Sequence, residues 1–279
     1  MRQLIAVLLA MLSSSLYAAA SALQALEARR APAESALRAS LLTRLVRRPL
    51  WLAGTGSSVV GWGLQAAALA LASVALVQPA LGLGLIVLLV LGSRVLGERI
   101  GAREIGGSIA IAGAVAVLAW AGPAEATSFT RAGSWAVGIA IALAAFAPLV
   151  LRLVGRAGGL PTSVVAGLGW ACVGLATALA VSALSDSRWV AAALWGVGVG
   201  LASGTTLLSE MTALQTWPAT RSIPVVFGIE MVLPAAVTPL LAEGASPPHP
   251  WLFALALIVA CAGAGVLGSS RTVARQMAG

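Results

Sequence analysis

Long hydrophobic runs, separated by short polar segments, make up most of this chain. The runs lie at residues 1–22, 50–73, 77–96, 104–121, 132–152, 161–184, 189–214, 222–242 and 250–268. Each is close to the ~20 residues that an α-helix needs to cross a bilayer. A soluble domain would show amphipathic stripes and polar loops instead. The pattern therefore predicts an all-α polytopic membrane protein with nine membrane-spanning helices.

Residues 51–122 show this pattern most clearly, because three apolar runs follow one another with little between them. We expect the first connection to be a proline-marked bend at Val77-Gln78-Pro79. We expect the second connection to be the charged turns from Arg94 to Glu104. Short turns between apolar runs are typical of consecutive transmembrane helices.

Composition supports the same class. The chain is 59% hydrophobic and 9% charged, with a mean hydropathy of +0.98, whereas soluble domains carry roughly 25% charged residues. The net charge of +8 comes from arginines that are spread over the predicted turns. They form no basic patch with interleaved aromatic residues, so we expect lipid and topology signals and no nucleic-acid partner.

The arginines also predict the orientation, because cationic loops stay in the cytoplasm. With the N-terminus outside, fourteen arginines lie in inside segments: Arg29, Arg30, Arg38, Arg44, Arg47, Arg48, Arg94, Arg99, Arg103, Arg152, Arg156, Arg221, Arg271 and Arg275. Three lie outside: Arg2, Arg131 and Arg188. This predicts a multi-pass protein of the cytoplasmic membrane with a cytoplasmic C-terminus. Six tryptophans at predicted helix ends are typical of an interfacial belt: Trp51, Trp120, Trp135, Trp189, Trp217 and Trp251.

Residues 1–22 match a signal peptide as well as a first transmembrane helix. Cleavage would export the arginine-rich segment 23–49 and invert every later helix, which the positive-inside pattern opposes. We therefore favour a retained helix followed by a basic cytoplasmic loop at 23–49.

An offset of 145 residues aligns Gln65 with Glu210, Ala68 with Ala213, Pro79 with Pro224 and Glu98 with Glu243. In the predicted topology the aligned helices cross the membrane in opposite directions, as in the inverted repeats of secondary transporters. We expect a single transmembrane domain with a first repeat at 1–121, a fifth helix and second repeat at 132–268, and a cytoplasmic tail at 269–279.

Two carboxylates lie inside apolar runs, Glu210 and Glu230. Each costs roughly 2.5–3.5 kcal/mol at the centre of a membrane helix, so such groups are commonly functional. They lie about 10 and 18 Å from the turn at Trp217-Pro218 and on the same side of it. We expect both to face one cavity, where a carboxylate can exchange a proton for a cationic substrate. The alternatives for Glu210 are that it snorkels to the inner interface or that it pairs with Arg221.

Further candidates are uncharged. Gln65 and Gln78 are expected to form interhelical hydrogen bonds or to bind substrate. Trp62, Trp170 and Trp195 lie deeper than the other tryptophans and suit packing or a cavity wall. Glu98, with Arg94, Arg99 and Arg103, is expected to form ion pairs across its turn. The faces Gly196-Gly200-Gly204, Gly54, Gly61, Gly63, Gly167, Gly169 and Gly174 predict close helix packing.

Several classes of chemistry lack their motifs. The two cysteines, Cys172 and Cys261, lie in apolar runs without CxxC spacing or a nearby histidine, and the only histidine, His249, lies in a proline-rich turn, so we expect no His/Cys metal centre. There is no P-loop motif, and no histidine accompanies the serines in a triad pattern. We therefore expect no enzyme activity, no cofactor and no metal site of that kind.

Residues 70–118, ALASVALVQPALGLGLIVLLVLGSRVLGERIGAREIGGSIAIAGAVAVL, resemble the drug/metabolite transporter superfamily, with a short helix, a proline bend, a helix ending in LGER and a glycine-rich helix. Residues 12–29, LSSSLYAAASALQALEAR, resemble the first helix of its NIPA-like magnesium-transporter branch and bacterial relatives. The nine-helix count fits that branch, whereas EamA-type relatives have ten helices. The resemblance implies alternating-access transport of metabolites, amphipathic compounds or Mg²⁺.

We expect a secondary transporter that moves a small organic solute, with proton coupling at Glu230 and a cavity formed by the second, third, seventh and eighth helices. One alternative is a divalent-cation pathway, because Mg²⁺ prefers carboxylate and carbonyl oxygen. Another is a membrane scaffold or accessory subunit without transport. The expected partners are the lipid bilayer and a small-molecule or cation substrate, and a homodimer is left open.

Overall fold

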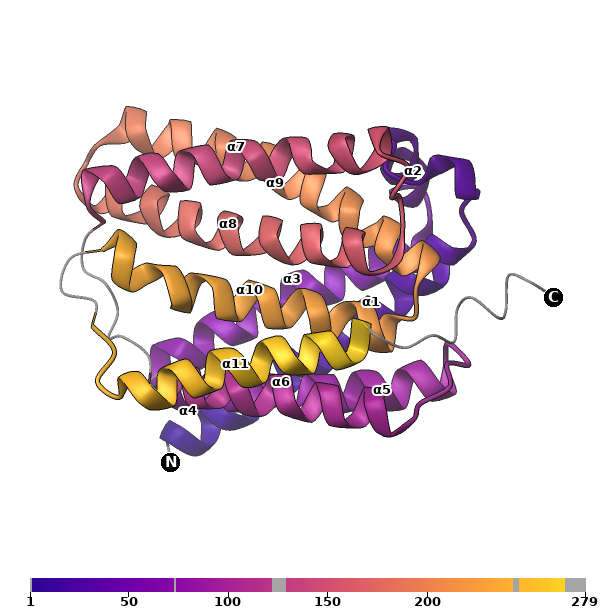
Figure 1. Ribbon diagram of the computed structural model, residues 1–279, viewed down its shortest axis with the longest axis horizontal. Coiled ribbons are helices and arrows are strands. Elements are labelled where there is room, and N and C mark those ends of the chain that lie inside the picture. Colours follow the sequence, from indigo (N-terminus) through magenta and orange to yellow (C-terminus); the bar gives the residue numbers. More distant parts are fainter. Residues whose placement is uncertain (1, 73, 122–128, 243–245, 269–279) are drawn as a thin grey trace.

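The computed structural model is a helical bundle that describes residues 2–72, 74–121, 129–242 and 246–268 (Figure 1). These ranges contain no strand, and one isolated bridge joins Phe129 and Ala242. The long helices are α1 (Arg2–Arg29), α3 (Pro49–Leu71), α4 (Val74–Gly82), α5 (Gly84–Arg94), α6 (Ala102–Ala121), α7 (Arg131–Leu153), α8 (Gly159–Ser185), α9 (Trp189–Thr216), α10 (Ala219–Leu241) and α11 (Pro250–Gly268). The short helices are η1 (Ala33–Ser35) and α2 (Ala39–Leu45). The predicted tail at 269–279 lies outside the described residues.

Seven of these helices are long and apolar enough to cross a membrane: α1, α6, α7, α8, α9, α10 and α11. The chain is therefore a multi-pass membrane protein, as the hydrophobic pattern predicts. The remaining two predicted spans differ. Helix α3 has 23 residues but is not among the seven, and its GTGSS run at 54–58 makes one half polar. The run 77–96 is divided between α4 and α5 at Leu83.

The predicted bend at Val77-Gln78-Pro79 is wrong. Helix α3 ends at Leu71, Ala72 is extended, and α4 begins at Val74, so the chain turns before the proline. Pro79 lies inside α4, where a membrane bundle tolerates proline because neighbouring groups satisfy the freed carbonyl. The second predicted connection is confirmed, because α5 ends at Arg94 and Glu104 lies in the first turn of α6.

The predicted basic loop at 23–49 is largely helical. Helix α1 continues to Arg29, and α2 follows η1. Leu37, Leu41 and Leu45 recur every four residues and are buried, whereas the arginines between them are exposed. This apolar stripe anchors α2 across one end of the bundle.

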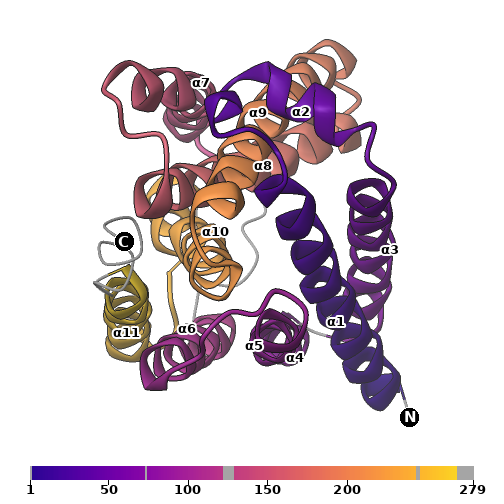
Figure 2. The same cartoon turned by 90° about the vertical axis from the view of Figure 1, so that its right-hand side faces the viewer.

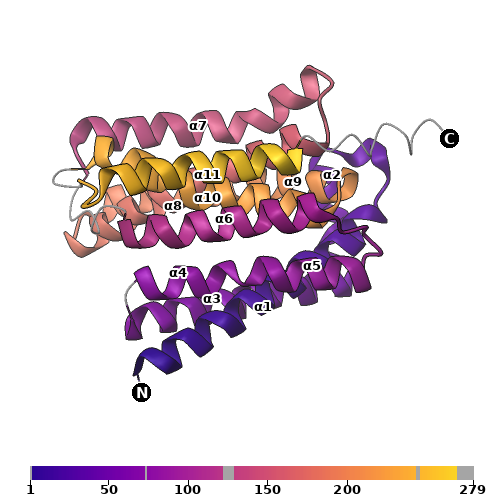
Figure 3. The ribbon, with the colours of Figure 1, turned by 60° about the horizontal axis from the view of Figure 1, so that its bottom comes forward.

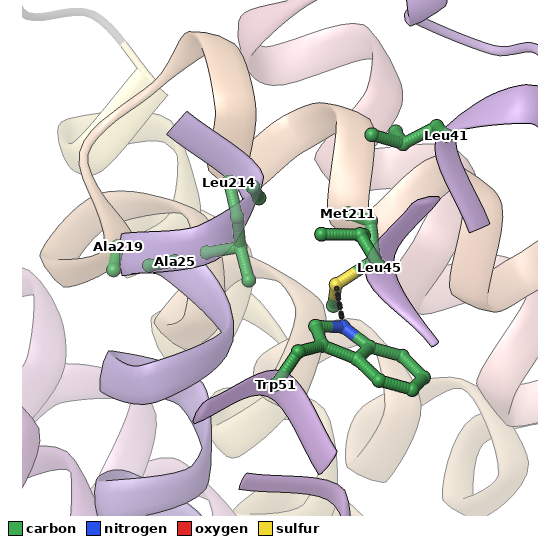
Figure 4. Close-up of a cluster of buried hydrophobic side chains, with 8 residues drawn as sticks. Ala25, Leu41, Leu45, Trp51, Met211, Leu214 and Ala219 are labelled. Carbon is green, nitrogen blue, oxygen red and sulfur yellow. Dashed lines mark hydrogen bonds between the residues drawn. The ribbon is translucent and has the colours of Figure 1, made fainter. Parts of the chain in front are cut away.

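Figure 4 shows the cluster beneath α2, where Trp51 donates its indole N–H to the sulfur of Met211 at 3.2 Å. Leu41, Leu45 and Leu214 pack beside this pair. Trp51 and Trp217 lie at helix ends, as predicted, but are buried in the bundle, so they do not belong to an exposed tryptophan belt. The other four tryptophans predicted at helix ends are largely exposed: Trp120, Trp135, Trp189 and Trp251.

The helices form two groups in which the first helix packs against the next ones along the chain. Helix α1 packs against α3 and against α4 and α5, while α8 packs against α9 and α10. Helices α6 and α11 lie side by side and join the groups (Figures 2 and 3). Ala68 and Ala213, which the 145-residue offset aligns, are both fully buried. The inverted repeat stays a prediction, and Glu243, the partner of Glu98 in the alignment, lies outside the described residues.

The predicted glycine face of α9 is wrong. A Cβ atom at Gly196, Gly200 or Gly204 would meet nothing within 4 Å, and the same holds for Gly63 and Gly174. The prediction holds for Gly54, Gly61, Gly167 and Gly169, where a Cβ would meet a neighbouring helix. Glycine on a lipid-facing surface and glycine at a helix contact have the same sequence spacing, so only the packing separates them.

Gly84 lies at a contact between helices, although its sequence spacing does not indicate this. Gly84→Ala should destabilise the protein. A Cβ there would lie 2.8 Å from both the backbone oxygen and Cβ of Ser14, so α1 and α5 would have to separate. Overpacking of this kind costs about 1–3 kcal/mol. The measurement is the thermal unfolding midpoint in detergent. Gly113→Ala is the matched control, because a Cβ at Gly113 meets nothing within 4 Å; equal midpoints for the two variants would contradict the prediction.

Candidate functional site

A cavity of about 610 Å³ lies between the two groups of helices. We call it the central cavity. Its walls come from α1, α3, α4, α5, α8, α9 and α10. The helices predicted to form it correspond to α3, α4 with α5, α9 and α10, and all of them contribute lining residues. The structure adds α1 and α8 to the predicted set.

Glu210 and Glu230 both line the central cavity, and both are partly buried. Glu210 lies on α9 and accepts a hydrogen bond from the indole N–H of Trp170 on α8, with 2.7 Å between Nε1 and Oε2. The alternative partner, Arg221, is unavailable because it donates to Glu104. The pairing with Arg221 considered for Glu210 is therefore wrong.

Glu230 lies on α10 and has no hydrogen bond or ion pair with the part of the chain that the structure describes. Glu210, Glu230 and Tyr17 line the same cavity. The two carboxylates, predicted from depth alone, therefore belong to one site.

Polar side chains of α1 and α3 complete one wall. The Tyr17 hydroxyl donates to Oε1 of Gln65 at 3.1 Å, and Nε2 of Gln24 donates to the Thr55 hydroxyl at 3.4 Å. Gln65 thus makes the interhelical hydrogen bond expected of it and also faces the cavity.

Four of the five predicted site residues meet at the central cavity: Glu210, Glu230, Gln65 and Trp62. Trp62 is largely exposed and forms part of the cavity margin. The fifth, Gln78, lies in α4, and its side chain is outside the described part of the chain. Of the three deeper tryptophans, Trp170 joins Trp62 here.

Tyr17 is the main residue that sequence reasoning missed. It is the only tyrosine of the chain and follows three consecutive serines inside the apolar run of α1. That polar patch in a spanning helix was the available signal. Ser14, Ser21 and Gln24 belong to the same helix face and also line the cavity.

The central cavity has an acidic and aromatic lining. Tyr17, Glu210 and Glu230 are its ionisable side chains among the described residues, and no arginine lines it. Tyr17, Trp62 and Trp170 supply aromatic surface. Carboxylates beside aromatic rings suit a cation with an apolar body, because both the charge and the ring faces attract it.

Ion pairs connect helices at the end of the bundle that carries α2. We call this the arginine-rich end and define it by Arg29, Arg30, Arg38, Arg44, Arg47, Arg48, Arg94, Arg99, Arg103, Arg152, Arg156 and Arg221. Glu98 accepts hydrogen bonds from the backbone N–H groups of Ala219 at 2.7 Å and Thr220 at 2.9 Å, and it pairs with Arg29. Its carboxylate thereby satisfies free N–H groups at the start of α10.

The expected pairing of Glu98 across its own turn is therefore wrong. Arg94, Arg99 and Arg103 are exposed. Glu98 instead binds groups that are 69 and 121 residues away in sequence. At the same end Gln215 donates to the carbonyls of Ala31 and Pro32, at 2.9 Å each, which ties α9 to the segment before α2.

Within the described ranges no three His, Cys, Asp or Glu side chains cluster closely enough to hold a metal ion. In comparisons with known proteins, no family model, no curated protein and no solved structure matches this chain. The resemblance to the drug/metabolite transporter superfamily thus stays a prediction from the quoted motifs.

Proposed function

We propose that this multi-pass membrane protein is a secondary transporter of a small organic solute, cationic when bound, which it exchanges for a proton at Glu230. The observation that carries the proposal is that two carboxylates, neither with a basic partner among the described residues, line one cavity between the two helix groups. A cavity near the middle of a two-part bundle is the usual place for a transporter's substrate.

Three carboxylates outside the cavity differ from Glu210 and Glu230 because each forms an ion pair with an arginine. Glu27 pairs with Arg30, Glu98 with Arg29, and Glu104 with Arg221. These carboxylates have structural partners that offset the cost of burial. Glu210 accepts only the indole N–H of Trp170, and Glu230 has neither a hydrogen bond nor an ion pair within the described residues. A structural role therefore does not explain why two carboxylates are present in membrane helices.

In alternating access, the central cavity must open toward the arginine-rich end during part of the cycle. Gln24 and Leu88 line the cavity, and Arg29 and Gly92, one turn further along their helices, meet Glu98. Under the positive-inside rule the arginine-rich end faces the cytoplasm. In the proposed cycle, separation of Glu98 from Arg29 and from α10 opens the cavity to that side.

Two alternative functions are a divalent-cation pathway and a scaffold without transport. A divalent-cation pathway would employ the two carboxylates, since Mg²⁺ takes few protein ligands and keeps several waters. A scaffold without transport predicts carboxylates on an exposed partner surface. Their joint position in one cavity disfavours the scaffold.

Flux into proteoliposomes with an internal pH dye tests the proposal, using a panel of cationic and neutral metabolites and Mg²⁺. We expect proton movement only when a cationic compound is present. Mg²⁺ flux without proton movement would favour the cation pathway. If no compound moves and none changes the fluorescence of the tryptophans that line the cavity, the scaffold is favoured.

A further inference from the structure

A second cavity, of about 620 Å³, lies where α7 begins, α8 ends and α9 begins. This is the end of the bundle opposite the arginine-rich end (Figure 1). The proposed transport function makes no use of it. Its polar and aromatic lining includes Arg131, Trp135, Ser182, Asp186, Arg188 and Trp195.

The uncommitted groups of this second cavity are hydrogen-bond donors. Arg131, the indole N–H groups of Trp135 and Trp195, and the Ser182 hydroxyl donate to no partner in the described part of the chain. Asp186 is the one acidic side chain among the described lining residues, and Arg188 pairs with it at 3.0 Å. Among the described lining residues, basic side chains therefore outnumber acidic ones by one, and hydrogen-bond donors are in surplus.

A phosphate group matches this surplus. Its oxygens accept several hydrogen bonds at once, and a guanidinium group can bind two of them together. Indole N–H groups commonly lie at headgroup level, where helices leave the hydrocarbon. Phe129 and Leu179 add apolar surface beside the donors, suited to the first part of an acyl chain.

We propose that the second cavity binds the phosphate of a phospholipid headgroup, with Arg131 as its main contact. Helix α7 lies at the edge of the bundle, where it packs against α8, α9 and α10, so the cavity adjoins lipid. Basic pockets between transmembrane helices on the cytoplasmic side bind lipid headgroups, and the second cavity offers the same chemistry at the opposite end. A bound lipid would hold α7 against α8 and α9.

The test measures stabilisation of the detergent-purified protein by added phosphatidylglycerol, by diacylglycerol with the same chains, and by glycerol 3-phosphate. We expect phosphatidylglycerol to raise the unfolding midpoint and diacylglycerol to have no effect. Arg131→Gln should weaken phosphatidylglycerol binding about tenfold or more, because a charge-assisted contact is lost. Arg103→Gln, an exposed arginine at the opposite end, is the matched control and should bind normally.

Asp186→Asn is a second test variant. It is expected to bind more tightly, and a poorly folded protein would not give that result. The substitution removes the negative charge and frees Arg188, so phosphatidylglycerol should bind more tightly than to the wild type. Equal stabilisation by glycerol 3-phosphate would overturn the lipid as the source of the phosphate. Equal binding by wild type and Arg131→Gln would overturn the site.

Discussion

Glu230→Gln should abolish substrate-dependent proton movement in proteoliposomes. Glutamine has nearly the same shape but cannot exchange a proton, and Glu230 is the cavity carboxylate without a hydrogen bond or ion pair in the described structure. The affinity for a cationic substrate should also fall about 10- to 100-fold, the usual value of one lost charge-assisted contact. Flux and binding are measured with the internal pH dye and by tryptophan fluorescence.

Glu34→Gln is the matched control, because Glu34 is exposed and does not line the central cavity. Glu210→Gln should have a smaller effect on affinity, since a glutamine oxygen can still accept the Trp170 indole N–H. Unchanged proton movement in Glu230→Gln would remove Glu230 from the mechanism. Proton movement lost only in Glu210→Gln would transfer the coupling role to Glu210.

The largest effect on stability is expected from Arg221→Met. Arg221 donates from Nε to Oε1 of Glu104 at 2.7 Å, and its Nη2 forms an ion pair with the same oxygen at 2.7 Å; both side chains are buried. Removal of one partner leaves an uncompensated buried charge, which costs about 3–5 kcal/mol. The measurement is the free energy of unfolding in mixed micelles.

The double variant Glu104→Leu with Arg221→Met separates this charge effect from lost packing. It should recover most of the stability, because replacing both members of a buried ion pair by apolar residues is often nearly neutral. The coupling between the two sites is then obtained from the double-mutant cycle. Additive losses in the cycle would show that the ion pair is not the cause.

The membrane class and the carboxylates of the site follow from local sequence. A run of about 20 apolar residues has few stable alternatives to a membrane helix, so runs such as 104–121 and 250–268 predict their helices closely. The cost of burying a carboxylate is similarly local, which is why Glu210 and Glu230 could be selected before their cavity was known. Gln65 and Trp62 were selected from their positions inside the apolar run at 50–73.

Only the tertiary structure determined the partners of side chains that lie between helices. Glu98 lies in a turn full of arginines, yet it binds Arg29 and the start of α10, because free helix N–H groups are brought to it by packing. Tyr17 became a cavity residue only when α1 was placed against α3. In lipid, hydrophobic residues and glycines face neighbours and acyl chains alike, so a helix's sequence does not say which of its faces is packed. Contacts between distant segments make that choice, and they assembled the acidic cavity from helices that the sequence presents separately.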